Sequence, residues 1–195
     1  QDRDLRLVRQ VRTLERGRMD PAKVFVVRNG PDLRRIRIMP PVEALKKSRK
    51  YLVGYVGVME KQEGIDLLLR IVRIIVQDLG RTDIHFGLVG GGTELESLRA
   101  YAQELGVANY VTFTGRVSDD DLVAMLNTAD LCVNPDVPNV MNDKSTMTKI
   151  MEFMALGKPI VQFDLTEGRV SAREASLYAR NHDEHDFAEK ILRLI

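Results

Sequence analysis

From Tyr51 onward, short runs of apolar residues alternate with longer segments in which apolar residues recur at helical spacing. The runs are continuously apolar, which is typical of strands buried on both faces of a parallel sheet. Strands are predicted at 51–58, 85–89, 111–114, 130–134, 159–163 and 176–179, and helices at 64–79, 95–105, 119–127, 146–156 and 185–195. This order predicts βαβ units, and therefore an α/β fold with a doubly wound parallel sheet.

The first 50 residues have a different character. A helix is predicted at 4–17, a strand at 24–27 and a turn at 29–32, with too few apolar residues for a separate core. This segment carries 15 Lys/Arg against 6 Asp/Glu, a net charge of +9, whereas the remainder carries −8. This positive charge would suit a phosphate-rich partner or, more simply, a solvated helix and linker. Because no aromatic residues are interleaved with the charges before Phe25, we expect no nucleic-acid partner. We interpret 1–50 as an interdomain connector with the remnant of an N-terminal domain, and 51–195 as a second domain truncated at its C-terminus.

The composition suits a globular protein of 195 residues, with 44% hydrophobic and 29% charged residues. The apolar runs are too short to span a membrane, and the charged opening residues do not resemble a signal peptide. Because the sequence starts without Met and stops on Ile195 within a predicted helix, we interpret it as a fragment. The lone Cys132 lies in an apolar run, so we expect a small core residue and a cytoplasmic protein, with a catalytic thiol as the weaker alternative.

Small and polar residues follow the predicted strands, where ligands bind in parallel α/β sheets. The strand ends are Gly57-Val58-Met59, Gly90-Gly91-Gly92, Gly115-Arg116-Val117 and Asn134-Pro135-Asp136. Glycines there allow backbone N–H groups to approach a phosphate or a sugar. The run at 90–92 lacks the G-x-G-x-x-G spacing of dinucleotide folds, so a nicotinamide site is disfavoured.

A polar segment precedes the helix predicted at 146–156. Ser145 or Thr146 is expected to cap that helix, whose first free N–H groups would then form an anion site. Lys149 and Glu152 are three residues apart, so they could meet one ligand, the ammonium on phosphate and the carboxylate on ribose. The alternative is a surface ion pair on a capped helix. His182 and His185 have a spacing that could bind a metal, but we expect solvated residues and no metal site.

These motifs, in this order, resemble the C-terminal domain of retaining glycosyltransferases of family 4, which have the GT-B fold. The resemblance rests on Gly57 with its loop, on 88–92, 111–117 and 129–130, and above all on 152–161, Glu-Phe-Met-Ala-Leu-Gly-Lys-Pro-Ile-Val. Asn29-Gly30-Pro31-Asp32-Leu33 is similar to the family's interdomain connector. The resemblance implies an active site in the cleft between two domains. It also implies a nucleotide-diphosphate sugar as donor, UDP- or GDP-linked, and neither metal nor cofactor.

The resemblance also assigns candidate residues. Glu152 would hold the ribose, and Lys144 and Asp143, the candidate catalytic residues, stand where the family has a carboxylate that faces the donor sugar. The remaining expected substrate-binding residues are Gly57, Lys61, Gly90, Gly91, Gly115, Arg116, Val117, Asn142, Ser145, Thr146 and Lys149. Val58 and Glu63 occupy the places of two family cations that bind the diphosphate. Either Lys61, Lys144 and Lys149 replace those cations, or the chain belongs to a divergent subgroup with another donor geometry.

The expected function is therefore transfer of a sugar from a nucleotide-diphosphate sugar to an acceptor hydroxyl with retention, in polysaccharide biosynthesis. The acceptor groups would come from the missing N-terminal domain, so the isolated fragment is expected to be inactive. A sugar-nucleotide epimerase of the same fold and a non-catalytic nucleotide-binding module are the alternatives. A lipid-linked acceptor would bring a cytoplasmic enzyme to the inner face of a membrane as a peripheral protein.

Overall fold

The computed structural model describes residues 17, 18, 20–23 and 30–195. The chain divides into two compact units, residues 1–30 and residues 31–195. The strand predicted at 24–27 lies outside the described residues, as does the helix predicted at 4–17 apart from Gly17. In the first unit the described residues include a single 3-10 turn, Pro21–Lys23.

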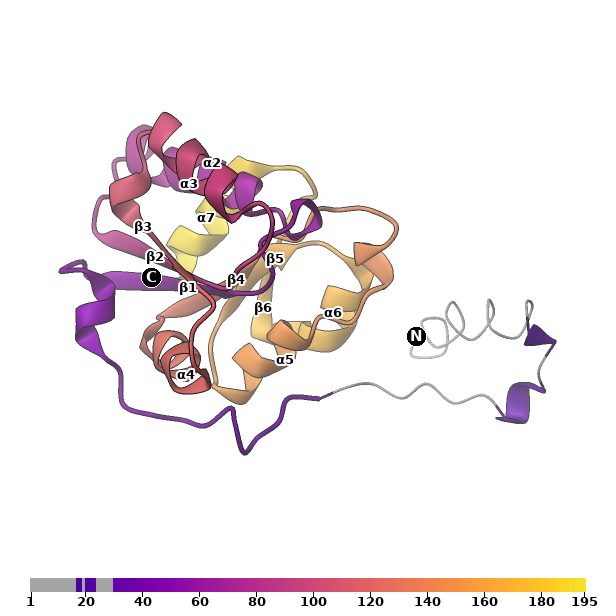
Figure 1. The fold of residues 1–195 in the computed structure, drawn as a ribbon. Helices are drawn as coiled ribbons and strands as arrows, with labels where there is room; N and C mark the ends of the chain where they lie inside the picture. Colours follow the sequence, from indigo (N-terminus) through magenta and orange to yellow (C-terminus); the bar gives the residue numbers. More distant parts are fainter. Residues whose placement is uncertain (1–16, 19, 24–29) are drawn as a thin grey trace. The chain divides into compact units, whose positions relative to one another are not determined.

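The second unit contains six parallel strands in the order β3-β2-β1-β4-β5-β6 (Figure 1). The strands are β1 (Tyr51–Val56), β2 (Ile84–Val89), β3 (Val111–Gly115), β4 (Leu131–Asn134), β5 (Ile160–Phe163) and β6 (Ser176–Ala179). The helices are α2 (Ile65–Arg73), α3 (Leu95–Glu104), α4 (Asp119–Thr128), α5 (Thr148–Ala155), α6 (Thr166–Ala172) and α7 (Glu184–Leu194). The doubly wound parallel sheet predicted from the hydrophobic pattern is confirmed.

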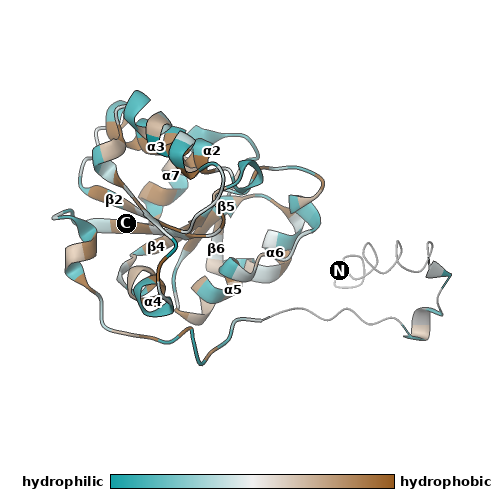
Figure 2. Ribbon diagram, in the orientation of Figure 1, coloured by the Kyte–Doolittle hydropathy of each residue, from teal (hydrophilic) through white to brown (hydrophobic). Residues whose placement is uncertain are grey.

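The two faces of the sheet pack against different helices. Helices α2, α3 and α7 cover one face, and α4, α5 and α6 cover the other (Figure 1). Successive residues of one strand enter opposite cores: Leu52 packs with α4 and α5, whereas Val53 packs with α2. This two-sided burial explains why the strands are continuously apolar rather than alternating. Figure 2 shows hydrophobic residues along the sheet and hydrophilic residues on the outer surfaces of the helices.

Three details differ from the sequence prediction. Strand β1 ends at Val56 rather than at residue 58. The helix predicted at 64–79 is α2 followed by a π-helix, Ile74–Asp78. Helix α6 was not among the predicted helices, because its seven residues are too few to establish a clear hydrophobic period.

Residues 31–50 run along α4 and belong to the same compact unit as the sheet. The backbone N–H of Met39 donates to Asn127 Oδ1 at 2.9 Å, and that of Val42 donates to Thr128 Oγ1 at 2.8 Å. Two short 3-10 turns, Glu43–Lys46 and Ala108–Tyr110, precede β1 and β3. The strand order reverses between β1 and β4, so their carboxyl ends form the topological switch point at which such sheets bind ligands.

Candidate functional site

The glycines after β1 and β2 bring the two strand-end loops into close contact. Gly90 has a φ of +136°, and a Cβ built there would lie 1.8 Å from the carbonyl oxygen of Gly57. A Cβ on Gly57 would lie 2.3 Å from the hydroxyl of Tyr55. A side chain at Gly90 would therefore force the loops apart, and one at Gly57 would displace the ring of Tyr55. Both glycines have a clear structural role at the carboxyl edge of the sheet.

Beside these loops, at the switch point, Lys149 lies among three acidic or hydroxyl side chains, which we call the Lys149 cluster: Tyr55, Glu63, Asp136 and Lys149. Lys149 Nζ donates to Glu63 Oε2 at 2.6 Å and to Asp136 Oδ1 at 2.7 Å. The hydroxyl of Tyr55 donates to Glu63 Oε2 at 3.1 Å. The ammonium also lies 5.0 Å from the centroid of the Tyr55 ring, within the range of a cation–π interaction.

The cluster is assembled from four separate elements. Tyr55 is in β1, Glu63 ends the 3-10 turn Lys61–Glu63, Asp136 follows β4 by two residues, and Lys149 is the second residue of α5. Gly64 directly follows the turn that carries Glu63, and it allows the loop after β1 to pack against the loop after β4. Its φ is +66°, and a Cβ there would lie 2.0 Å from the carbonyl oxygen of Pro135.

Asn142 also links the loop after β1 to the loop after β4. Its side-chain amide is buried and donates to the carbonyl oxygens of Gln62 and Val137, both at 2.9 Å. The sequence prediction placed Asn142 in the substrate site. The structure uses both of its amide hydrogens to hold the loops that carry Glu63 and Asp136.

The electrostatics of the Lys149 cluster follow from its burial. The side chain of Asp136 is 1% exposed, that of Lys149 is 9% exposed and that of Glu63 is 18% exposed. Burial raises the pKa of Asp136, while the ammonium of Lys149 lowers it and the charge of Glu63 raises it further. Burial and the neighbouring carboxylates also raise the pKa of Tyr55 well above its usual value, so the phenol stays protonated.

Two buried side-chain oxygens on β4 and the loop after it lack a hydrogen-bond partner among the described residues. They are Oδ2 of Asp136 and Oδ1 of Asn134, the last residue of β4. Buried polar atoms are nearly always hydrogen-bonded, so unpartnered acceptors here indicate a place where a proton, a water or a ligand is expected.

Glu152 lies one turn further along α5 and is also buried. Its Oε1 is 3.6 Å from a terminal guanidinium nitrogen of Arg35, which comes from the segment before β1 and also pairs with Asp119. Burial raises the pKa of Glu152, Arg35 opposes that rise and Asp119 adds to it. The alternative of a surface ion pair between Lys149 and Glu152 is wrong, because both side chains are buried and have other partners.

The prediction that Ser145 or Thr146 caps the helix is also wrong. Helix α5 begins at Thr148, and its N-cap residue is Met147, which offers no side-chain oxygen. The hydroxyl of Ser145 donates to the carbonyl oxygen of Met141 at 2.7 Å, and that of Thr146 donates to Glu167 Oε2 at 3.0 Å. The two hydroxyls instead hold the loop before α5 to itself and to α6.

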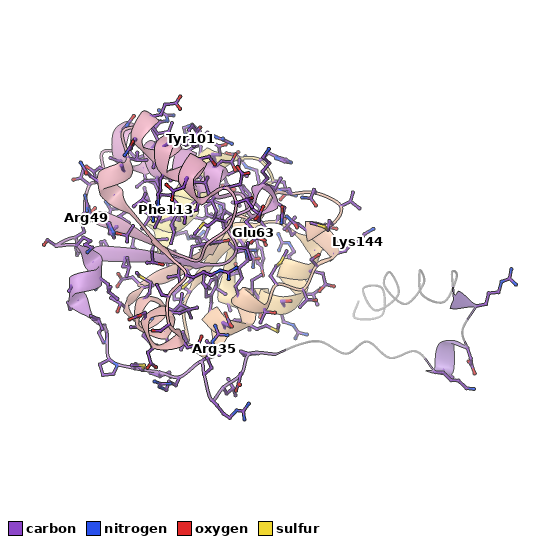
Figure 3. All side chains as sticks on the ribbon, viewed as in Figure 1. Arg35, Arg49, Glu63, Tyr101, Phe113 and Lys144 are labelled. Carbon is purple, nitrogen blue, oxygen red and sulfur yellow. The ribbon has the colours of Figure 1, made fainter. Side chains whose placement is uncertain are left out.

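The two expected catalytic residues lie in the 3-10 turn Asn142–Lys144. Oδ1 of Asp143 accepts a hydrogen bond from the backbone N–H of Thr166 at 2.8 Å, at the start of α6. Lys144 is half-buried and lies on an outer loop, whereas Glu63 lies further inside the molecule (Figure 3). The structure therefore does not place Lys144 or Asp143 in the Lys149 cluster.

The other expected cations, Lys61 and Arg116, are not members of the Lys149 cluster. Lys61 lines a cavity of about 370 Å³ whose polar lining also includes Glu60, Asp66, Glu94 and His182. Arg116 is exposed and passes over the backbone of Gly91, since a Cβ on Gly91 would lie 3.3 Å from Arg116 Cγ. Gly115, at the end of β3, has a φ of +69°, and Val117 after it is 37% exposed.

Residues outside the site behave as core or surface residues. Cys132 is fully buried, and burial raises the pKa of its thiol to about 12, which confirms the core interpretation and disfavours a nucleophile. His182 and His185 are exposed, as expected. Among the described residues no group of three His, Cys, Asp or Glu side chains is arranged to hold a metal ion. No helix in that part of the chain is both long and apolar enough to cross a membrane.

Sequence reasoning identified Lys149 but missed two of the residues that hold it. Tyr55 was counted among the apolar residues of a strand, and its hydroxyl gave no signal of a polar partner. Asp136 was noted only as part of a strand end. The available signal was a carboxylate directly after a fully buried strand, at the point where the strand order reverses.

Comparison with known proteins agrees with this architecture. Residues 50–195 match the family of group 1 glycosyl transferases. The D-inositol 3-phosphate glycosyltransferase of Corynebacterium jeikeium is 27% identical over 155 residues, which cover 75% of this chain and 36% of that protein. A GDP-mannose-dependent alpha-(1-6)-phosphatidylinositol monomannoside mannosyltransferase of Mycobacterium tuberculosis is 50% identical over 48 residues, which cover 25% of this chain and 12% of the relative.

Solved structures show the same fold. S. aureus TarM, crystallised with fondaparinux, alpha-GlcNAc-glycerol and UDP, superposes with a TM-score of 0.71 at 20% identity, covering 95% of this chain and 34% of TarM. The lipopolysaccharide outer core galactosyltransferase WaaB superposes with a TM-score of 0.66 at 22% identity, covering 95% of this chain and 50% of WaaB.

The chain thus spans little more than a third of the first of these relatives. The match to the group 1 family begins one residue before β1 and continues to Ile195. It therefore includes the whole sheet and every residue of the Lys149 cluster. Because the match covers well over half of its residues, the chain belongs to the group 1 family of glycosyl transferases.

Proposed function

We propose that this chain is the donor-binding domain of a retaining glycosyltransferase, which moves a sugar from a UDP- or GDP-linked donor to an acceptor hydroxyl. The observation that carries the proposal is the position of Lys149 and Glu152. Both are on α5, at the carboxyl edge of the sheet where the strand order reverses between β1 and β4, in a member of a glycosyl transferase family. Ligands of open parallel sheets bind at this point.

The proposed chemistry needs a cation for the leaving diphosphate and an acceptor for the ribose hydroxyls. The ammonium of Lys149 has three N–H donors, of which Glu63 and Asp136 accept two. The third would donate to the diphosphate and stabilise the charge that develops as the glycosidic bond breaks. The exposed guanidinium of Arg116 would add positive charge at the same edge. The buried carboxylate of Glu152 would accept from the ribose in place of Arg35.

The acceptor groups would come from an N-terminal domain that precedes this chain in the whole enzyme, for which residues 1–50 would form the connector and a remnant. A lipid-linked acceptor would bring that enzyme to a membrane surface as a peripheral protein. Because the donor and acceptor must be held together for transfer, we expect the 195-residue chain to bind the donor without transferring sugar.

Calorimetry of this chain with UDP, GDP and ADP tests the proposal. We expect UDP or GDP to bind, and Glu152→Gln to weaken that binding by about tenfold or more, because a hydrogen bond to a charged group contributes about 1.5–3 kcal/mol. Glu96→Gln is the matched control, since Glu96 is an exposed carboxylate of α3. Failure of all three nucleotides to bind at millimolar concentration would contradict the proposal.

A further inference from the structure

The Lys149 cluster contains more negative than positive charge. One ammonium faces two carboxylates, and the ion pairs that the described residues form with Glu63 and Asp136 are both to Lys149. The remaining member, Tyr55, is a neutral phenol that donates to Glu63. With both carboxylates ionised, the cluster has a net charge of −1 in a largely buried position.

This charge conflicts with the binding of a diphosphate. A second anion placed against a buried anionic cluster is repelled strongly, because the interior screens charges far less than water does. An ammonium that is already outweighed by two carboxylates therefore offers little attraction to phosphate. One proton on the carboxylate pair removes the conflict, since it brings the cluster to zero net charge and leaves the ammonium in place.

We propose that the Lys149 cluster takes up one proton when the nucleotide-diphosphate sugar binds, and that Glu63 and Asp136 are positioning residues that hold the Lys149 ammonium for the diphosphate. The inference rests on the proposed function and adds a pH dependence to the same site. In the bound state one carboxyl is protonated, the other keeps its ion pair with Lys149, and the third N–H of the ammonium donates to a phosphate oxygen.

Asp136 is the carboxyl better placed to hold the proton. Its side chain is 1% exposed, against 18% for Glu63. Its Oδ1 accepts a hydrogen bond from Lys149, while its Oδ2 is buried without a hydrogen-bond partner; Oδ1 of Asn134, two residues earlier in the chain, is also buried and unpartnered. A protonated Oδ2 would be a donor, and the amide oxygen of Asn134 is an acceptor. Burial, the largest influence, raises the pKa of Asp136 and acts in the same direction, whereas Lys149 and the side chain of Asn134 lower it.

The test uses UDP-glucose and GDP-mannose, whose phosphates are esterified and have no ionisation between about pH 5.5 and 8.5. Calorimetry of the 195-residue chain in two buffers with different ionisation enthalpies counts the protons taken up on binding. We expect uptake approaching one proton at the upper end of this range, and an affinity that rises by up to about tenfold for each unit by which the pH falls.

Two variants separate this role from a merely structural one. Glu63→Gln removes one negative charge, so the cluster is neutral without a proton; we expect tighter binding at pH 8.5 than in the wild type and a smaller proton uptake. Asp136→Asn should act in the same direction and serves if Glu63→Gln does not fold. Glu60→Gln is the matched control, because Glu60 lies on the same loop but bonds to Thr93 instead of Lys149.

The possible failures are distinguishable. Binding of either nucleotide sugar without proton uptake and with a flat pH profile would overturn this inference and leave the proposed function standing. Weaker binding of Glu63→Gln at every pH, with unchanged proton uptake, would likewise overturn it. No binding of either compound at any pH would overturn the proposed function, and this inference with it.

Discussion

Replacement of Lys149 by Met should be strongly destabilising, because it removes the cation from two carboxylates that the fold holds together. Lys149 Nζ lies 2.6 Å from Glu63 and 2.7 Å from Asp136. Removing one partner of a buried pair typically costs about 3–5 kcal/mol, since it leaves an uncompensated buried charge. Glu63 retains some contact with water, so we expect about 3 kcal/mol at pH 7. The measurement is unfolding in urea, in which the loss of stability should lower the midpoint urea concentration while the dependence of the free energy on urea concentration stays similar.

The pH dependence gives this prediction its sharpest test. Burial already raises the pKa of Asp136, and without the ammonium that lowers it, the folded-state pKa of this carboxyl rises further above its unfolded value. The folded state then binds more protons than the unfolded state at mildly acidic pH, so the variant's stability falls as pH rises. The deficit of Lys149→Met should therefore be smaller at pH 5 than at pH 7.

Two further variants control for the change of side chain. Arg37→Met removes an ion pair with Asp120 in which both side chains are exposed, and it should cost under about 1 kcal/mol. Combining Lys149→Met with Glu63→Gln and Asp136→Asn leaves an uncharged cluster and should recover much of the stability. A loss below about 1 kcal/mol for Lys149→Met, or an equal loss at pH 5 and pH 7, would refute the reasoning.

Three other predictions concern the fold that supports the site. Gly90→Ala should lower the melting temperature strongly, since φ at this position is +136° and the new Cβ would lie 1.8 Å from the carbonyl oxygen of Gly57. Gly30→Ala is the control, because there is open space around Gly30. Equal melting temperatures for the two variants would contradict this prediction. Burial, with the charges of Arg49 and Lys47, lowers the pKa of His85 to about 4, so its ring signals in NMR spectra should titrate near pH 4. Its contribution to the free energy of unfolding should be lost as the pH falls from about 6.5 to 4. Titration of the ring near pH 6.5 would show this to be wrong. The buried thiol of Cys132 should react with a thiol reagent only as fast as the chain unfolds, and a rapid reaction of the folded protein would contradict its burial.

The fold and the position of the site at the carboxyl edge could be predicted because they depend on local patterns. A continuously apolar strand such as β4 must be buried on both faces. Helices of about ten residues between such strands are long enough to cross the sheet, so consecutive strands are expected to run parallel. These features are determined over a few neighbouring residues, so the sequence was sufficient for them.

The partners of Lys149 were decided only by the tertiary structure. Glu63 is 86 residues away and Asp136 is 13 residues away, and they meet the ammonium because Gly64 and Asn142 bring the loops after β1 and β4 together. The same holds for Glu152, whose partner Arg35 comes from a segment that the sequence suggested was only a connector. The helix cap predicted at Thr146 failed for a related reason, since Glu167 on α6 offered Thr146 a competing partner that no local pattern contains. A sequence shows which side chains can be charged, but burial and distance determine which charges meet, and those arise only when separate strands close on one another.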